Sequence, residues 1–289
     1  MTQIKPRGVY VLSGRTARGL LDAPEGSVEV SLDLGMTRQV VRVEEGAFLL
    51  PDGSSLGRDG LAGAFREPED CIEITAGQCA KVFEFDEASH RDYKLYQPVE
   101  GHPPTLLIAG HNMHAIVGMD PWQDARQKVR ALRGRRGGLC LDTCFGLGYS
   151  AQLLAGADWD RVVSCEVDEI VLEFAAVNPW SRGAFESDRI ELVHDDVASY
   201  LSGCADGSFA GIFHDPPVVH LAGELYGLDF YRELARVLEP RGVLYHYVGS
   251  PGGRGGHDQT RRVMQRLHEA GYPQTRRAPS GTLARSARR

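Results

Sequence analysis

The first hundred residues alternate apolar and polar side chains in short runs, which is the period of a strand with one face in water. The clearest run covers residues 27–34. Further runs at 38–53, 71–75 and 80–86 are separated by turns rich in Gly, Pro and Asp. We therefore predict a small antiparallel β domain over residues 1–118.

From Asp120 onward, runs of strand type alternate with runs of helical type. Asp120 and Pro121 suit the N-cap and the first position of a helix that extends to residue 132. Further strands are predicted at 138–144, 161–167, 189–196, 209–217 and 241–249, and further helices from Tyr149 and at 168–177, 228–238 and 257–271. Because strands joined by helices pair in parallel, we predict an α/β fold with a doubly wound sheet over residues 119–289.

The Arg-rich sequence at 275–289 predicts a final hairpin about a Ser-Gly turn, with Arg side chains that keep an edge strand solvated. Residues 261–289 carry eight Arg and one Glu, a net charge of +7, so residues 1–260 carry −14 of the total of −7. This distribution is not the uniformly basic surface of a nucleic-acid-binding protein. Arg side chains can still contact phosphate, so RNA stays open as a less favoured partner.

The composition is that of an ordinary globular protein, with 42% hydrophobic and 25% charged residues. The sequence begins with polar residues and contains no apolar run of about eighteen residues, so we expect a cytoplasmic protein with no membrane partner. Six cysteines form no C-x-x-C pair, and we expect reduced, partly buried thiols. Five histidines, His111, His114, His214, His220 and His246, lack a metal-binding spacing, so no metal site is predicted.

A glycine-rich turn follows the strand predicted at 138–144. Gly146, Gly148 and Ala151 form a G-x-G-x-x-A run, and Asp142 stands four residues before the first of these glycines. Such a run lets a ligand approach the backbone, although alone it also fits a strand-to-helix turn that binds nothing.

Three successive predicted strands end in carboxylates, at Asp142, Glu166 and Asp195. The carboxyl ends of parallel strands meet at one edge, where these acids suit an ammonium, a ribose diol and an adenine amino group. A nicotinamide dinucleotide needs only the second acid, and its pyrophosphate would be repelled by an acid before the glycines. S-adenosylmethionine (SAM) has no phosphate and carries an amino group, so the pattern favours SAM.

The segments LDTCFGLGYSA, CEVDE, LVHDDV and FHDPP resemble the successive motifs of class I SAM-dependent methyltransferases. With DPWQDARQKV, NPWS, LAGELYGLDFYRELARVLEPRG and HYVGSPG, they are similar to a family of predicted archaeal-type methyltransferases over roughly residues 27–289. The resemblance implies that three groups of residues hold the methionine part, the ribose and the adenine of SAM. The methionine part would be held by Asp142, Gly146 and Gly148, with Tyr149 beside them. The ribose would be held by Glu166, and the adenine by Asp195, Val167 and Val197.

The segment HDPPVVH follows the fourth strand of the predicted sheet. Asp215 can accept a hydrogen bond from an amine, and the prolines stiffen the backbone, although Asp-Pro-Pro also fits a rigid exit turn. The D-P-P motif of amino-methyltransferases is followed by an aromatic residue, and Val218 here disfavours a flipped nucleobase. We therefore expect a small-molecule amine substrate. The predicted catalytic residues are Asp215, His214 and Tyr226, and the predicted substrate-binding residues are Pro216, Pro217, His220, Glu224, Tyr93 and Tyr96.

Two other functions remain open. Residues 221–244 also resemble spermidine synthases, which would imply aminopropyl transfer and release of methylthioadenosine, and a variant would transfer or cyclise the aminocarboxypropyl arm of SAM. Two departures count against this: Leu147 and Val218 stand where those enzymes carry Asp. The third function is a catalytically silent module that binds SAM or nucleic acid. Any of these proteins could be a homo-oligomer.

Overall fold

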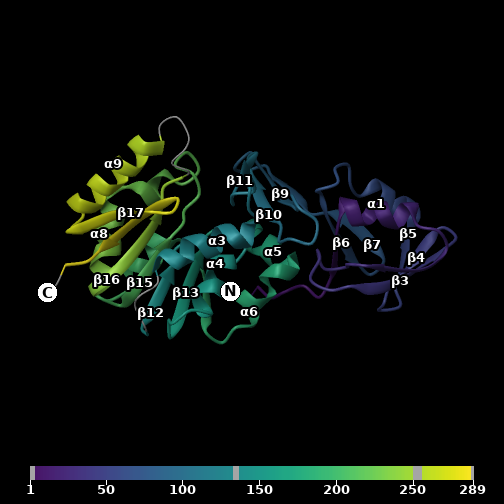
Figure 1. Ribbon diagram of the computed structural model, residues 1–289, viewed down its shortest axis with the longest axis horizontal. Coiled ribbons are helices and arrows are strands. Elements are labelled where there is room, and N and C mark those ends of the chain that lie inside the picture. The colour runs from purple at the N-terminus through teal and green to yellow at the C-terminus, as the bar shows by residue number, and fades with distance from the viewer. Residues whose placement is uncertain (1–3, 133–136, 250–255, 288–289) are drawn as a thin grey trace. The chain divides into compact units, whose positions relative to one another are not determined.

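The computed structural model describes residues 4–132, 137–249 and 256–287 (Figure 1). The chain divides into two units. Unit 1 comprises Met1–Asp124 and Ile170–Gly183, and unit 2 comprises Ala125–Glu169 and Ala184–Arg289. Residues 119–124 and 170–183 therefore belong to the same unit as the N-terminal part, whereas the sequence predicted a single division after residue 118.

The described residues of unit 1 form three antiparallel sheets. Their strand orders are β1 (Tyr10–Ser13), β6 (Cys71–Thr75), β7 (Gln78–Lys81); β2 (Gly26–Val30), β3 (Gln39–Glu44), β4 (Ala47–Leu49), β5 (Ser55–Gly57); and β11 (His111–Asn112), β10 (Thr105–Ile108), β9 (Arg91–Tyr96), β8 (Phe83–Asp86). Helices α1 (Gly14–Asp22) and α2 (Arg58–Gly63) contribute Leu20 and Leu61 to a core with Phe48 and Ile72. The predicted β-rich character is confirmed, and the two helices were not predicted.

Two predicted strands of unit 1 have different limits in the structure. The strand predicted at 27–34 ends at Val30, because Ser31 and Asp33 turn their side chains to the local backbone. The hydroxyl of Ser31 accepts a hydrogen bond from the amide of Gly35 at 2.6 Å, and Oδ1 of Asp33 accepts one from Thr37 at 2.9 Å. The run at 80–86 is divided between β7 and β8.

The segment Ile170–Gly183 carries most of α5 (Glu169–Val177), the short helix η2 (Pro179–Ser181) and the first residues of α6 (Arg182–Glu186). The rings of Phe174 and Tyr93 lie 6.5 Å apart, and the indole of Trp180 donates a hydrogen bond to the carbonyl of Leu34 at 3.3 Å. Asn178 caps η2 through the amide of Trp180. The NPWS segment therefore has a structural role within unit 1.

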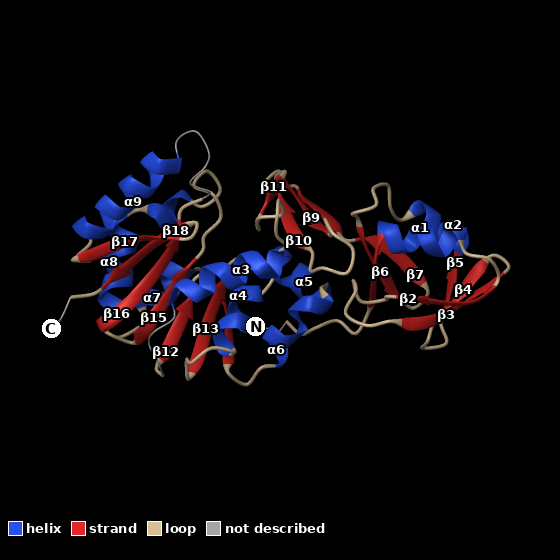
Figure 2. Cartoon of the chain, in the orientation of Figure 1, coloured by secondary structure: helices blue, strands red, loops and turns tan. Residues whose placement is uncertain are grey.

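In the described part of unit 2, one seven-stranded sheet has the order β14-β13-β12-β15-β16-β18-β17 (Figure 2). The strands are β12 (Leu139–Asp142), β13 (Arg161–Glu166), β14 (Ile190–His194), β15 (Phe209–His214), β16 (Leu238–Tyr247), β17 (Gln274–Ala278) and β18 (Gly281–Arg285). The first five strands of that order run parallel, and the hairpin β17-β18 joins β16 antiparallel. The predicted α/β fold and the final hairpin are both confirmed.

Helices cover both faces of this sheet. They are needed there because successive side chains of a strand point to opposite faces, and buried parallel strands carry apolar side chains on both. The helices are α3 (Pro121–Val129), η1 (Arg130–Leu132), α4 (Tyr149–Ala155), α7 (Val197–Ser202), η3 (Gly223–Tyr226), α8 (Leu228–Val237) and α9 (Gly256–Glu269). Leu141 belongs to a core with Leu201, Leu234 and Leu267 from α7, α8 and α9, whereas the adjacent Cys140 belongs to a second core. That core contains Leu132, Leu154 and Trp159. In the described parts of the chain, no helix combines the length and the apolar character needed to span a membrane.

Candidate functional site

The carboxyl ends of the parallel strands bring the predicted acids to one edge of the sheet in unit 2. Asp142 ends β12 and Glu166 ends β13, while Asp195 and Asp215 directly follow β14 and β15. The strand register pairs Asp142 with Ser164 of β13 on one side and with Phe213 of β15 on the other. This is the edge at which open α/β sheets bind their ligands.

Asp142 is fully buried and only half satisfied. Its Oδ2 accepts hydrogen bonds from the hydroxyls of Ser150 at 2.9 Å and Ser164 at 2.8 Å. None of the described residues makes a hydrogen bond of normal geometry to Oδ1, although the backbone of Cys144 is close enough to the carboxyl to lower its pKa. Burial raises the pKa of Asp142 to about 7, against the two serine hydroxyls, and the charge of Asp215 adds to the rise. A cationic donor at Oδ1 would satisfy this oxygen and favour the ionised carboxylate.

The glycines of the turn have different roles. Gly148 has a φ of +72°, and a Cβ there would lie 2.7 Å from the ring of Phe145 and 2.8 Å from Ala184, so close packing requires glycine. Gly146 has a φ of +54°, and a Cβ there would have no atom within 4 Å. Gly146 therefore leaves open space beside the backbone, whereas Gly148 lets α4 begin against its neighbours, with Tyr149 buried as its first residue.

Glu166 holds the glycine turn to the end of β13. Its Oε2 accepts a hydrogen bond from the amide of Gly146 at 2.9 Å, and its Oε1 accepts from the amides of Val167 and Asp168 at 3.1 Å. Burial raises the pKa of Glu166 to about 7. Oε1 thus accepts two hydrogen bonds, whereas Oε2 keeps a second lone pair that a ribose hydroxyl could use. Val167 is 62% exposed, which leaves apolar surface beside this carboxylate.

The third acid lies at the start of α7. Asp195 is exposed, and its Oδ1 accepts a hydrogen bond from the amide of Asp196 at 2.8 Å. Asp196 is the N-cap of α7, accepting from the amide of Ser199 at 2.9 Å, and Val197 is buried. Asp195 can therefore turn its free oxygen to a ligand while Asp196 fixes the helix.

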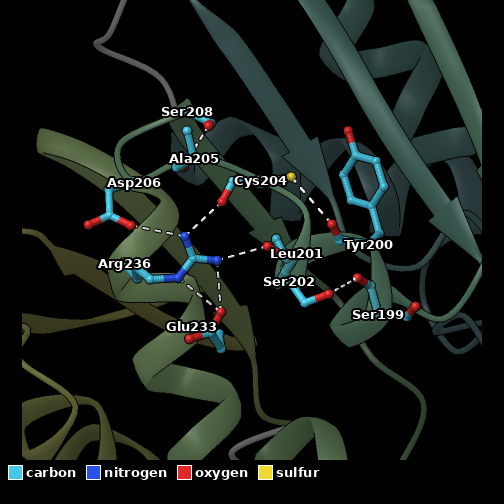
Figure 3. Close-up of polar contacts among 10 residues, drawn as sticks. All are labelled: Ser199, Tyr200, Leu201, Ser202, Cys204, Ala205, Asp206, Ser208, Glu233 and Arg236. Atoms are coloured by element: carbon cyan, nitrogen blue, oxygen red, sulfur yellow. Dashed lines mark hydrogen bonds and ion pairs between the residues drawn. The ribbon is translucent and has the colours of Figure 1, made fainter.

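Arg236 of α8 fixes the other end of α7 (Figure 3). Its guanidinium donates to the carbonyls of Leu201 at 2.8 Å and Cys204 at 2.7 Å, and it pairs with Asp206 at 3.0 Å and Glu233 at 2.8 Å. Carbonyls at the end of a helix lack partners within the helix, so this cation satisfies and orients them. The position of Asp195 is thus set from both ends of α7.

Asp215 forms a close ion pair with Lys128 of α3. The Nζ of Lys128 lies 2.9 Å from Oδ2 and 3.2 Å from Oδ1, and it also lies 4.1 Å from the ring centroid of Tyr247. The side chain of Lys128 is 3% exposed and that of Asp215 is 20% exposed. The residue predicted to receive an amine therefore already holds an ammonium of the chain itself.

The residues beside Asp215 form a rigid support. His214 is fully buried, with Nδ1 2.7 Å from the hydroxyl of Thr143 and Nε2 3.0 Å from the carbonyl of Leu225. Burial lowers the pKa of His214 to about 3. Tyr226 is buried and donates its hydroxyl to the carbonyl of Pro217 at 3.0 Å. Both predicted catalytic side chains thus hold the backbone around Asp-Pro-Pro, and neither ring is exposed.

The remaining predicted substrate residues lie in different surroundings. Pro216 is buried, Pro217 is half-buried, and His220 and Glu224 are exposed near the exposed side chains of Val218 and Val219. Tyr93 and Tyr96 belong to unit 1, where Tyr93 is buried and the ring of Tyr96 lies 5.3 Å from the Nζ of Lys94. Their roles as substrate contacts stay predictions. In the described residues, no group of three or more His, Cys, Asp and Glu side chains could hold a metal ion.

Sequence reasoning missed the pairing of Lys128 with Asp215 and the serine hydroxyls around Asp142. Lys128 did carry a signal, because it follows Ala125 by three residues and so lies on the buried side of the predicted helix. A charged residue in an apolar stripe needs a partner. Ser150 and Ser164 carried none, since their contacts depend on how β12, β13 and α4 pack.

A relative of nearly the same length establishes the family. The uncharacterized protein MJ1233 of Methanocaldococcus jannaschii is 32% identical over 271 residues, which cover 92% of this chain and 91% of that protein. The chain belongs to the family of MJ1233. No family model matches the chain.

Part of the chain is similar in sequence to polyamine aminopropyltransferases, and its fold is similar to that of spermidine synthases. A polyamine aminopropyltransferase of Mycobacterium tuberculosis is 32% identical over 113 residues, which are 37% of this chain and only 22% of that enzyme. The spermidine synthase of Thermotoga maritima has a TM-score of 0.52 at 15% identity, covering 99% of this chain and 82% of its own. A spermidine synthase bound to the transition-state analogue AdoDATO has a TM-score of 0.54 at 16% identity with the same coverage. The fold is therefore that of the spermidine synthases.

Proposed function

We propose that this chain is a transferase that binds SAM and transfers its methyl group to an amine. The observation that carries the proposal is the buried carboxylate of Asp142, with one oxygen that no described residue satisfies, beside the open turn at Gly146. A buried polar atom without a partner is costly unless a ligand pairs with it. The ammonium of the methionine part has the charge and the donors that Oδ1 needs.

Other residues at this edge fit the remainder of SAM. Glu166 would accept the ribose hydroxyls, Asp195 would accept from the adenine amino group, and the exposed Val167 would contact the adenine ring. Bound SAM supplies a methyl carbon that its sulfonium makes electrophilic. The protein then has to orient a nucleophile in line with that carbon and exclude water.

Asp215 would orient the amine by accepting a hydrogen bond from its N–H group. His214 and Tyr226 would act as positioning residues, because their hydrogen bonds fix Thr143, Leu225 and the carbonyl of Pro217. The buried, neutral His214 is poorly suited to remove a proton from substrate. Val218 and Val219 would contact the apolar part of a substrate and limit water at the reacting atoms.

Aminopropyl transfer is the second candidate function. It is favoured by the partial matches to polyamine aminopropyltransferases and by the spermidine synthase fold. Two residues count against it, because the resemblance to those enzymes implies Asp at both positions. They are Leu147 and Val218. The two reactions use related sulfonium donors and leave different nucleosides.

Product analysis tests the proposal. The purified chain is incubated with SAM, or with decarboxylated SAM, together with a panel of amines, and the nucleoside products are identified by mass spectrometry. S-adenosylhomocysteine from SAM is the expected product, and Asp215→Asn is the matched control that should retain SAM binding without product. Methylthioadenosine would replace the proposal with the second function. Binding of SAM without either product would indicate a silent module.

A further inference from the structure

Lys128 places a buried cation on the carboxylate that would receive the substrate amine. Its Nζ contacts both oxygens of Asp215, at 2.9 and 3.2 Å, and lies over the face of the Tyr247 ring. An ammonium that is 3% exposed has lost most of its hydration. Bidentate pairing and a cation–π contact are the interactions that compensate for this loss. Lys128 is therefore held as a charged partner of Asp215 inside the site.

This pairing changes what Asp215 offers to a substrate. An uncompensated carboxylate would favour the protonated form of a nearby amine, and an ammonium has no lone pair with which to attack. Lys128 cancels that negative charge, while the oxygens of Asp215 can still accept a hydrogen bond from a neutral N–H group. The site then orients an amine without holding it in its unreactive form.

Among the described residues, three other titratable groups that respond to the charge of Asp215 come from three elements. Asp142 ends β12, Cys144 follows it in the glycine turn, and Tyr226 belongs to η3; each has its pKa raised in part by the charge of Asp215. Burial is the largest cause of all three shifts, which favours neutral forms of these groups. Lys128 is thus the group in this set that supplies a positive charge.

We infer that Lys128, acting through Asp215 as a positioning residue, restricts the substrate to weakly basic amines, which keep an appreciable uncharged fraction near neutral pH. This rests on the proposed function. Terminal α-amino groups, with pKa values of about 7.7–8.0, are uncharged in roughly a tenth of their molecules at pH 7, whereas the alkylamines of polyamines resemble lysine at about 10.4 and are almost entirely protonated. The neutral nitrogen uses its lone pair to form the new N–C bond as the S–C bond of the donor breaks, and the methylated product then releases one proton to water.

Binding of putrescine, a dication at neutral pH, tests this inference without a known substrate. Calorimetry at about pH 7 compares the wild-type chain with Lys128→Met, Lys128→Arg and the double variant Lys128→Met/Asp215→Asn. Lys128→Met removes this ammonium from Asp215, so it should bind putrescine at least about tenfold more tightly than the wild type, a difference of about 1.4 kcal/mol. Lys128→Arg keeps the ion pair and should resemble the wild type, and the double variant should lose the gain.

A second variant covers the case in which Lys128→Met does not fold. Lys128→Gln, checked by circular dichroism, should show the same gain in putrescine binding. In turnover with SAM and an amine from the active panel, it should also move the acid limb of the pH profile to higher pH by about one unit, because the substrate ammonium is stabilised. Equal putrescine affinity in wild-type and folded Lys128 variants would overturn the inference. Failure of the proposed function is separate, since it appears as no SAM-dependent product in the wild type.

Discussion

Asp142 and Asp215 lie at the tips of adjacent strands and have opposite surroundings. Asp142 is fully buried between two serine hydroxyls, and burial raises its pKa to about 7. Asp215 is partly exposed and pairs with the ammonium of Lys128. A carboxylate held by hydroxyls alone can gain from a cation that a ligand brings, whereas a carboxylate with its own cation gains little. Under the proposed function, Asp142 would pair with the ammonium of the donor and Asp215 would orient a neutral acceptor.

The largest expected effect is on SAM affinity. Asp142→Asn keeps the shape of the side chain and removes the charge that would pair with the ligand ammonium. Loss of a charged hydrogen bond of about 1.5–3 kcal/mol should weaken SAM binding by about ten- to a hundredfold in calorimetry. Asp215→Asn is the matched control and should change SAM affinity by less than about threefold. Equal losses in the two variants would contradict the division of roles between the two strand tips.

The next largest effect is on the pH dependence of stability, to which the acids Asp142 and Glu166 contribute. Asp142 and Glu166 have pKa values raised to about 7 by burial, so between about pH 4 and pH 7 the folded chain holds protons that the unfolded chain has released. Stability is therefore highest below this range and should fall across it by about 1.4 kcal/mol per pH unit for each of the two groups, and it should level off above pH 7. Urea unfolding of the ligand-free chain measures the slope.

Substitution assigns that slope to its source. Asp142→Asn should flatten the decline and make the chain more stable than the wild type at about pH 8, where the wild type carries a buried charge. A slope unchanged in Asp142→Asn would mean that this carboxylate stays ionised in the folded chain. Addition of SAM should also reduce the slope in the wild type, because the ligand favours the ionised form.

The smallest effect concerns the open side of the Asp142 site. Gly146→Ala places a methyl group in empty space at a φ of +54°, so it should cost about 1 kcal/mol in the free energy of unfolding through backbone strain. It should also weaken SAM binding, because the methyl group occupies space toward the ligand. Gly203→Ala is the control, since Gly203 has a φ of −86° at the end of α7 and should change both quantities little. Undiminished SAM affinity in Gly146→Ala would place the ligand elsewhere.

The order of strands and helices in unit 2 could be predicted because each element has a clear period and a clear end. Asp142 and Glu166 terminate apolar runs, so the rule that parallel strands end at one edge is enough to predict that these two acids lie at the same edge. The end of β2 at Val30 could not be predicted from alternation, because Ser31 and Asp33 bind the local backbone while Leu32 and Leu34 continue the apolar pattern.

The chemical surroundings of the acids were less accessible to sequence reasoning. Lys128 is 87 residues away from Asp215 along the chain, and their contact depends on the packing of α3 against the end of β15. The burial of His214 and Tyr226 likewise depends on how η3 returns to the sheet. A motif predicts which residue types meet at an edge, while the sign and strength of their charges depend on partners from distant segments.

The hairpin β17-β18 has a further consequence for the sheet as a whole. It supplies the backbone partners of Val243, Leu244, Tyr245 and His246 in β16, all of which are buried. The outermost strand then becomes β17, whose Arg276 and Arg277 are exposed. A chain cut before this hairpin would present an apolar strand with unpaired amides to other molecules, so its first symptom should be self-association rather than loss of ligand binding.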